Sequence, residues 1–131
     1  MASVWMKLVT IWSSSFMFNY TTCNERKCDF FQIAPISELP SGERLFVDVG
    51  DISIVIFNIA DNYYAIKDQC SHEDLEIGDG DLEGHDLSCP HHGAHFDVRT
   101  GKVLSLPAVN DIPAYPVRIR DGMIEIGIPR E

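Results

Sequence analysis

Two short units that each join a cysteine to a histidine place the strongest constraint on this chain of 131 residues. The first unit is Cys70-Ser71-His72, and after sixteen intervening residues the second is Cys89-Pro90-His91-His92-Gly93. Both units lie in turn-rich sequence, so two loops can bring two thiolates and two imidazoles to one metal centre. Soft thiolates and borderline imidazoles select zinc or iron–sulfur rather than magnesium or calcium.

The residues alone leave the choice between zinc and iron open. Two cysteines and two histidines suit a structural zinc site, although such sites commonly pair cysteine with cysteine and histidine with histidine. Each unit here instead pairs one cysteine with one histidine, which fits a binuclear centre whose two irons take different ligands. The two hypotheses are therefore an electron carrier and a zinc-binding structural or interaction module without redox activity.

The chain around these units has a β pattern from residue 30 onward. Turn signals such as Gly50-Asp51, Asp61-Asn62 and Asp121-Gly122 separate short apolar or alternating runs, and no helical period persists beyond a turn or two. We expect a small antiparallel β-sandwich or barrel, with residues 68–113 forming a two-loop cluster-binding subdomain. The expected strands are Phe30–Ile33, Leu45–Val49, Ile52–Ile59, Tyr63–Lys67, Tyr115–Arg120 and Met123–Ile128.

Residues 1–28 differ from the rest and are expected to be a poorly ordered leader before a domain at 29–131. Their apolar stretch, Val4–Phe18, is interrupted by Lys7 and three serines, so it is too short to span a membrane. A signal or transit peptide, a short docking strand or helix, and a weak membrane anchor are the alternatives. Cys23 and Cys28 have no neighbouring histidine and are expected to be free thiols.

Net charge narrows the choice of partners. The chain carries a formal charge of −10, which argues against binding to nucleic acid or to an anionic membrane and favours a basic partner. Between the two ligand units lies an acidic run without any base, which is either a solvated loop or a docking surface. Its members are Glu73, Asp74, Glu76, Asp79, Asp81, Glu83 and Asp86.

The spacing of the two units resembles the Rieske 2Fe–2S motif, C-x-H followed after sixteen residues by C-x₂-H-G. Residues 94–101, Ala-His-Phe-Asp-Val-Arg-Thr-Gly, resemble the F-D-x-x-T-G hairpin of Rieske-type ferredoxins, and the likeness extends over about residues 30–128. The resemblance implies that Cys70 and Cys89 bind one iron and that His72 and His92 bind the other. It selects His92 over His91, although Cys89-Pro90-His91 is itself a C-x-H unit. The remaining histidines, His85, His91 and His95, are then expected not to be ligands.

The resemblance is specifically to low-potential Rieske ferredoxins of aromatic-ring dioxygenases. Leu75 and His91 occupy the positions of the extra disulfide found in respiratory Rieske proteins, and Ala94 stands where those proteins place a serine hydroxyl. With fewer hydrogen bonds to the cluster and many nearby acids, we expect a potential toward the low end of the range of roughly −150 to +300 mV.

This resemblance also implies a role and a set of partners. An NAD(P)H-dependent flavin reductase would donate one electron at a time, and a terminal oxygenase would accept it, each through a transient electrostatic contact. No catalytic constellation is visible, so the chain is expected to be an electron carrier and not an enzyme. We expect a cytoplasmic monomer without stable membrane insertion, although the leader leaves export or organelle targeting open.

Overall fold

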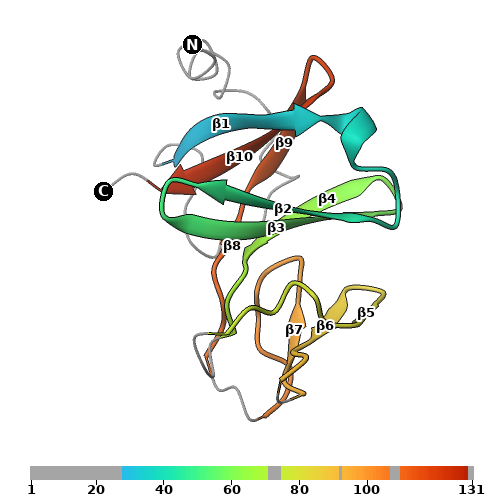
Figure 1. The fold of residues 1–131 in the computed structure, drawn as a ribbon, viewed down its shortest axis with the longest axis vertical. Coiled ribbons are helices and arrows are strands. Elements are labelled where there is room, and N and C mark those ends of the chain that lie inside the picture. The colour runs from blue at the N-terminus through green and yellow to red at the C-terminus, as the bar shows by residue number, and fades with distance from the viewer. Residues whose placement is uncertain (1–27, 71–74, 92, 107–109, 130–131) are drawn as a thin grey trace.

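The computed structural model describes residues 28–70, 75–91, 93–106 and 110–129, and this part of the chain is all-β. Its elements form three antiparallel sheets (Figure 1). A single turn of 3₁₀ helix, Ile36–Glu38, follows the first strand. The described strands are β1 (Cys28–Pro35), β2 (Arg44–Val49), β3 (Ile52–Ile59), β4 (Asn62–Lys67), β5 (Leu82–Glu83), β6 (Asp86–Ser88), β7 (His95–Asp97), β8 (Ala114–Tyr115), β9 (Val117–Arg120) and β10 (Met123–Pro129).

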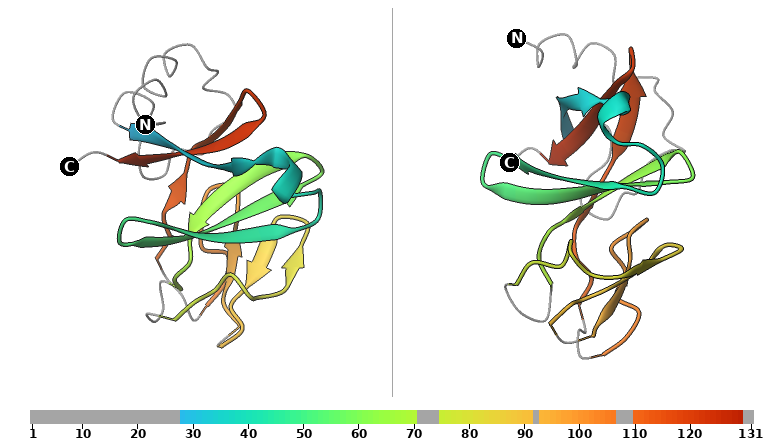
Figure 2. Two further views of the ribbon diagram at one scale, coloured as in Figure 1. Left: turned by 45° about the horizontal axis from the view of Figure 1, so that its top comes forward. Right: turned by 45° about the vertical axis from the view of Figure 1, so that its right-hand side comes forward.

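Two of the sheets form a sandwich, as the sequence predicted. One sheet has the strand order β1-β10-β9 and the other the order β2-β3-β4-β8. Figure 2 shows the two layers from two further directions. Apolar side chains of both sheets fill the space between them, and the buried members of this core are Leu39, Ile54, Ile56, Ala65, Tyr115, Val117, Ile124 and Ile126.

Strand β3 serves two cores, which explains its nearly continuous apolar sequence. Ile54 and Ile56 belong to the sandwich core. Val55 and Phe57, on the opposite face, belong to a second core that continues into the smaller sheet β5-β6-β7. Because successive side chains of a strand point to opposite faces, a strand covered on both sides needs apolar residues throughout. The smaller sheet lies below the sandwich in Figure 1 and carries the second Cys/His unit.

Two details differ from the sequence prediction, and a third concerns residues that the structure does not describe. The β3–β4 turn is centred on Ala60 and Asp61, with φ of 54° and 67°, rather than on Asp61-Asn62, because Asn62 already pairs with Ile59. Cys28 is disulfide-bonded, so the expectation of a free thiol there was wrong. Residues 1–27 lie outside the described residues, and the leader and the domain boundary stay predictions.

In the described part of the chain, no helix has the length and apolarity that crossing a membrane requires.

Candidate metal centre

The two predicted cysteine ligands lie in loops that leave the ends of short strands. Cys70 follows β4, and Cys89 lies in the connection between β6 and β7. Both side chains belong to the second core, which the large sheet and the small sheet share. The fold thus joins two segments that are nineteen positions apart in sequence at one end of the molecule.

A buried carboxylate, Asp68, organises the first loop. Its Oδ1 accepts hydrogen bonds from the backbone N–H of Ile77 at 2.9 Å and of Gly78 at 2.6 Å. Inside the ring that this closes, the Cys70 N–H donates to the Leu75 carbonyl at 2.8 Å. The Asp68 side chain, two positions before Cys70, therefore holds the start and the end of this loop together.

Arg44, on strand β2 of the large sheet, contacts the same loop. Neither Asp68 nor Arg44 was among the site residues predicted from the sequence. The Arg44 Nη1 donates to the carbonyls of Gly78 at 2.5 Å and Gly80 at 2.8 Å. Its guanidinium carbon lies 5.1 Å from the centre of the Phe57 ring, within the range of a cation–π contact. The Asp-x-Cys spacing was a weak signal for Asp68, whereas no local pattern joins Arg44 to a loop more than thirty residues away.

The second loop is a tight turn that closes on Cys89. The Cys89 N–H donates to the Ala94 carbonyl at 2.6 Å, and the Gly93 N–H donates back to the Cys89 carbonyl at 2.9 Å. Gly93 has a φ of +76°, a left-handed conformation that favours glycine. A Cβ at Gly93 would meet no heavy atom within 4 Å beyond its chain neighbours in the described part of the protein, so conformation, rather than close packing, explains this glycine.

The two thiols fit a soft metal centre. Cys70 and Cys89 are 2% and 3% exposed, and neither forms a disulfide. They lie among apolar side chains such as Ile77 and Phe96, so each thiolate would be shielded from water. The two imidazole ligands of the prediction, His72 and His92, lie outside the described residues. Accordingly, the described residues bring no group of three metal-ligating side chains together.

The three histidines that are not predicted ligands, His85, His91 and His95, lie in different environments. The His95 ring Nδ1 lies 2.6 Å from Asp86 Oδ1, and both side chains are half-exposed. The His85 ring meets Tyr64 edge-on, with 5.5 Å between ring centres. His91 is exposed in the second loop. That none of the three binds iron stays a prediction.

The F-D-x-x-T-G segment forms the tight hairpin after β7. The Asp97 carbonyl accepts from the N–H of Gly101 at 2.7 Å, while its carboxylate binds the Arg99 side chain at 2.8 Å and 3.0 Å. Burial alone would raise the pKa of Asp97, but the hydrogen bonds and positive charge of Arg99 outweigh it, so the pKa falls below its usual value. A Cβ on Gly101 would lie 1.9 Å from the Ile112 carbonyl oxygen, so only glycine fits.

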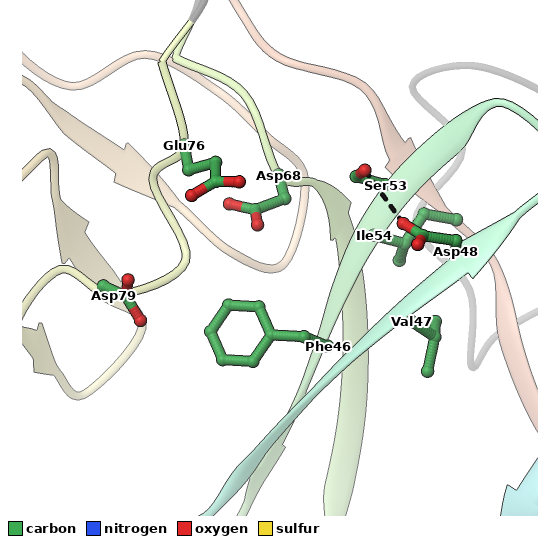
Figure 3. Close-up of a pocket in the computed structure, with 8 residues that line it drawn as sticks. All are labelled: Phe46, Val47, Asp48, Ser53, Ile54, Asp68, Glu76 and Asp79. Carbon is green, nitrogen blue, oxygen red and sulfur yellow. Dashed lines mark hydrogen bonds between the residues drawn. The ribbon is translucent and has the colours of Figure 1, made fainter.

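Exposed acidic side chains lie in the first loop and in the segment that follows it. Glu76, Asp79, Asp81 and Glu83 are exposed, so these four members of the acidic run are solvated, whereas Asp86 lies half-exposed beside His95. Asp68, Glu76 and Asp79 also line an open cavity of about 330 Å³ that reaches Phe46 and Asp48 on β2 (Figure 3). The cavity is strongly acidic but, among the described residues, it does not gather a metal-ligand set.

A model of the Rieske [2Fe-2S] domain matches residues 29–116, which is more than half of the chain. The chain therefore belongs to the Rieske [2Fe-2S] domain family. This confirms the family, the all-β fold and the 2Fe–2S cofactor predicted from the sequence, and it disfavours the zinc module.

Within the family, the chain is similar to ferredoxin subunits of dioxygenase systems, which are electron carriers. It is 40% identical over 96 residues to the 3-phenylpropionate/cinnamic acid dioxygenase ferredoxin subunit of Escherichia coli (strain K12), covering 72% of this chain and 90% of the relative. The ferredoxin of carbazole 1,9a-dioxygenase from Nocardioides aromaticivorans IC177 superposes with a TM-score of 0.71 at 29% identity, covering 77% of this chain and 98% of that one. A structure described as a complex of reduced oxygenase and oxidized ferredoxin in carbazole 1,9a-dioxygenase also superposes, with a TM-score of 0.71 at 25% identity, covering 78% of this chain and 95% of that one.

Proposed function

We propose that this protein takes one electron at a time from an NAD(P)H-dependent flavin reductase and passes it to the terminal oxygenase of an aromatic-ring dioxygenase, or to a related acceptor. Cys70, His72, Cys89 and His92 would hold the cluster, which would supply a one-electron redox change for accepting and then donating each electron. A two-electron hydride from NAD(P)H thus serves two turns of the carrier. The ferredoxin subunits to which the chain is similar support this role.

The single observation that carries the proposal is the pair of buried, unbridged thiols in two loops closed by backbone hydrogen bonds. Cys70 and Cys89 would hold one iron in the apolar core, and His72 and His92 would hold the other. Thiolate ligands in a dry, preformed setting suit a centre that must change its charge with little rearrangement.

The ligand assignment is tested by histidine replacement in the holoprotein. We expect His72→Ala and His92→Ala each to abolish the electron paramagnetic resonance signal of the reduced mixed-ligand cluster. The matched controls His91→Ala and His95→Ala should keep it. If His91→Ala removes the signal and His92→Ala keeps it, the assignment within the second loop is wrong.

The direction of electron flow is tested by reconstitution without oxygen. A flavin reductase from an aromatic-ring dioxygenase system, supplied with NADH, should bleach the visible absorption of the oxidised protein. Addition of an oxidised terminal oxygenase should restore that absorption. If the reductase fails to bleach a protein that dithionite does bleach, a flavin reductase is not its donor.

The same proposal includes an electrostatic contact with those partners. The exposed acids Glu76, Asp79, Asp81 and Glu83 lie between the two ligand loops in sequence and would meet a basic patch on the partner. Rates of electron transfer should therefore fall steeply as ionic strength rises, since screening weakens contacts between exposed charges. A rate that does not change with salt would remove the acidic surface from the proposal.

We further propose a monomeric carrier of the cytoplasm with a potential at the low end of the Rieske range. Ala94 is fully buried beside Cys89 and has no hydroxyl to donate to the cluster. Redox titration of the purified protein tests the potential, and sedimentation tests its mass.

A further inference from the structure

The sheet β1-β10-β9 has an outer face that points away from the sandwich core. In antiparallel pairs, residues directly opposite each other point to the same side of the sheet. Phe30 lies opposite Gly127, Gln32 opposite Glu125, and Glu125 opposite Arg118. Their chain neighbours, among them Ile124 and Ile126, fill the core on the other side. We call the first set, Phe30, Gln32, Arg118, Glu125 and Gly127, the outer face.

This outer face is buried, although it lies on the outside of a sandwich. Phe30 is 1% exposed, Arg118 2% and Glu125 0%. Arg118 Nε donates to Glu125 Oε1 at 2.7 Å, and the Arg118 guanidinium carbon lies 4.0 Å from the centre of the Phe30 ring. Removing two charges from water is costly, so a solvated sheet face would leave this ion pair at least partly wet.

Pro116 lies against Gly127 at this face, and no described strand outside the sheet itself packs extensively over it. Strand β1 has its extensive packing with β10, and the large sheet lies against the opposite, core side. Among the residues that the structure describes, Phe30 is separate from both larger cores and groups with Cys28. Glu125 Oε2 is buried and has no hydrogen-bond partner among the described residues, so the face also offers an acceptor. Phe30, Arg118 and Gly127 each take part in at least one further polar or ring interaction beyond these.

We propose that residues 1–27 of this chain dock on the outer face and cover it. The segment enters β1 directly at Cys28, so it is tethered at the edge of this face. An extended chain spans about 3.3 Å per residue and neighbouring strands lie about 4.8 Å apart, so a short part of the segment reaches across all three strands. Reach is therefore no obstacle to docking.

The composition of the segment suits this face better than it suits water. Its first 24 residues contain one charged side chain, Lys7, and five large aromatic residues, which are Trp5, Trp12, Phe16, Phe18 and Tyr20. Aromatic side chains bury large apolar areas, and tryptophan also carries an N–H that can donate to a buried acceptor such as Glu125 Oε2. The segment thus offers apolar side chains and N–H donors, and the outer face offers an apolar surface and a buried acceptor.

Docking at this place leaves the metal centre accessible. The sheet β1-β10-β9 and the small sheet β5-β6-β7 lie at opposite ends of the molecule in Figure 1 and in the right-hand view of Figure 2. The inference is therefore independent of the proposed electron transfer. Loss of docking should change neither the cluster spectrum nor the reduction potential.

Tryptophan fluorescence of the full-length holoprotein tests the proposal, because both tryptophans of the chain, Trp5 and Trp12, lie in the segment. We expect acrylamide to quench the native protein several-fold less effectively than the urea-unfolded protein. The emission maximum should be blue-shifted in the native state, and this second readout does not depend on energy transfer to the cluster. Native quenching equal to that of the unfolded chain would overturn the proposal.

Two variants and one matched control connect the protection to the outer face. Phe30→Ser removes its apolar centre and should raise quenching toward the unfolded value. Gln32→Glu places a carboxylate opposite Glu125 at a half-buried site and should do the same, which provides a second test if Phe30→Ser does not fold. Phe46→Ser removes a 47% exposed phenylalanine from the other sheet and should leave quenching unchanged. Wild-type quenching in both face variants would show that the segment docks elsewhere.

Other occupants give different results. If a second copy of the chain covers the face, protection should weaken on dilution and follow a change in mass by sedimentation. If a lipid surface covers it, protection should appear only with vesicles of phosphatidylcholine and phosphatidylglycerol. Protection that is independent of protein concentration and present without lipid supports docking within one chain, and either alternative result overturns it.

Discussion

Replacement of Asp68 by alanine should release the first ligand loop. Asp68 is 9% exposed as a residue, and its carboxylate accepts hydrogen bonds from the N–H groups of Ile77 and Gly78. Both of those residues are buried, so water does not readily replace the lost acceptor. Cys70 lies between Asp68 and these two donors in sequence, so its loop depends on this anchor.

The size of the effect follows from the two orphaned donors. Each buried donor left without a partner costs about 1–3 kcal/mol, so Asp68→Ala should cost about 2–6 kcal/mol locally. A penalty of about 3 kcal/mol corresponds to a more than hundredfold increase in the open form of the loop, since about 1.4 kcal/mol is a factor of ten. Because local opening exposes Cys70, the proposed ligand, the cluster should be lost faster than the whole domain unfolds.

The assay is the decay of visible absorption of the holoprotein in the presence of an iron chelator. Asp68→Asn keeps an oxygen acceptor and should restore most of the wild-type lifetime. Asp48→Ala is the matched control, because Asp48 is an exposed acid lining the same cavity and bonds there to the Ser53 hydroxyl. A wild-type decay rate in Asp68→Ala, or an equal loss in Asp48→Ala, would refute the anchoring role.

Three further predictions concern the second loop and its hairpin. Gly101→Ala should destabilise the domain by more than about 1 kcal/mol, measured by urea unfolding, because its Cβ meets the Ile112 carbonyl and its φ is +78°. Ala94→Ser should raise the reduction potential on redox titration, by about 60–130 mV if one hydrogen bond to the reduced cluster contributes about 1.5–3 kcal/mol. The lowered pKa of Asp97 gives stability that is present above its unfolded value of about 3.9 and is lost as pH falls through its folded value. Arg99→Gln should therefore reduce stability at pH 7 by less than about 1 kcal/mol, with the difference vanishing in acid.

The strands that face a core could be predicted from the sequence because burial leaves a periodic trace. Ile52–Ile59 is a strand with the predicted bounds, and its continuous apolar pattern reflects two cores, one on each side. The alternation of Leu45, Val47 and Val49 likewise marks the core side of β2. Cysteine and histidine at fixed spacing give an equally local signal, which is why Cys70 and Cys89 could be proposed as ligands without any structure. That they bind iron stays a prediction.

The residues that sequence reasoning missed act over long range or through the backbone. Arg44 contacts carbonyls of Gly78 and Gly80, and a carbonyl leaves no trace in the identity of its residue. The turn at Ala60 and Asp61 was displaced by one position because neither residue is glycine, although both adopt positive φ. The position of this turn and the contacts of Arg44 depend on how the strands pair, and the conformational preferences of single residues do not predict that pairing.

For Arg118, the alternating pattern of β9 predicts which face of the strand the side chain lies on, but it does not predict whether that face is buried. Alternation in β9 correctly separates Arg118 and Arg120 from Val117 and Ile119, and a polar side is ordinarily the wet one. The structure instead buries Arg118 against Phe30 and pairs it with Glu125. Excluding water from these two charges costs free energy, which only their mutual contact offsets, so the burial itself requires material over the face. The covering material is therefore part of what stabilises this sheet, and disturbing the face should loosen the cover before it affects the cores or the ligand loops.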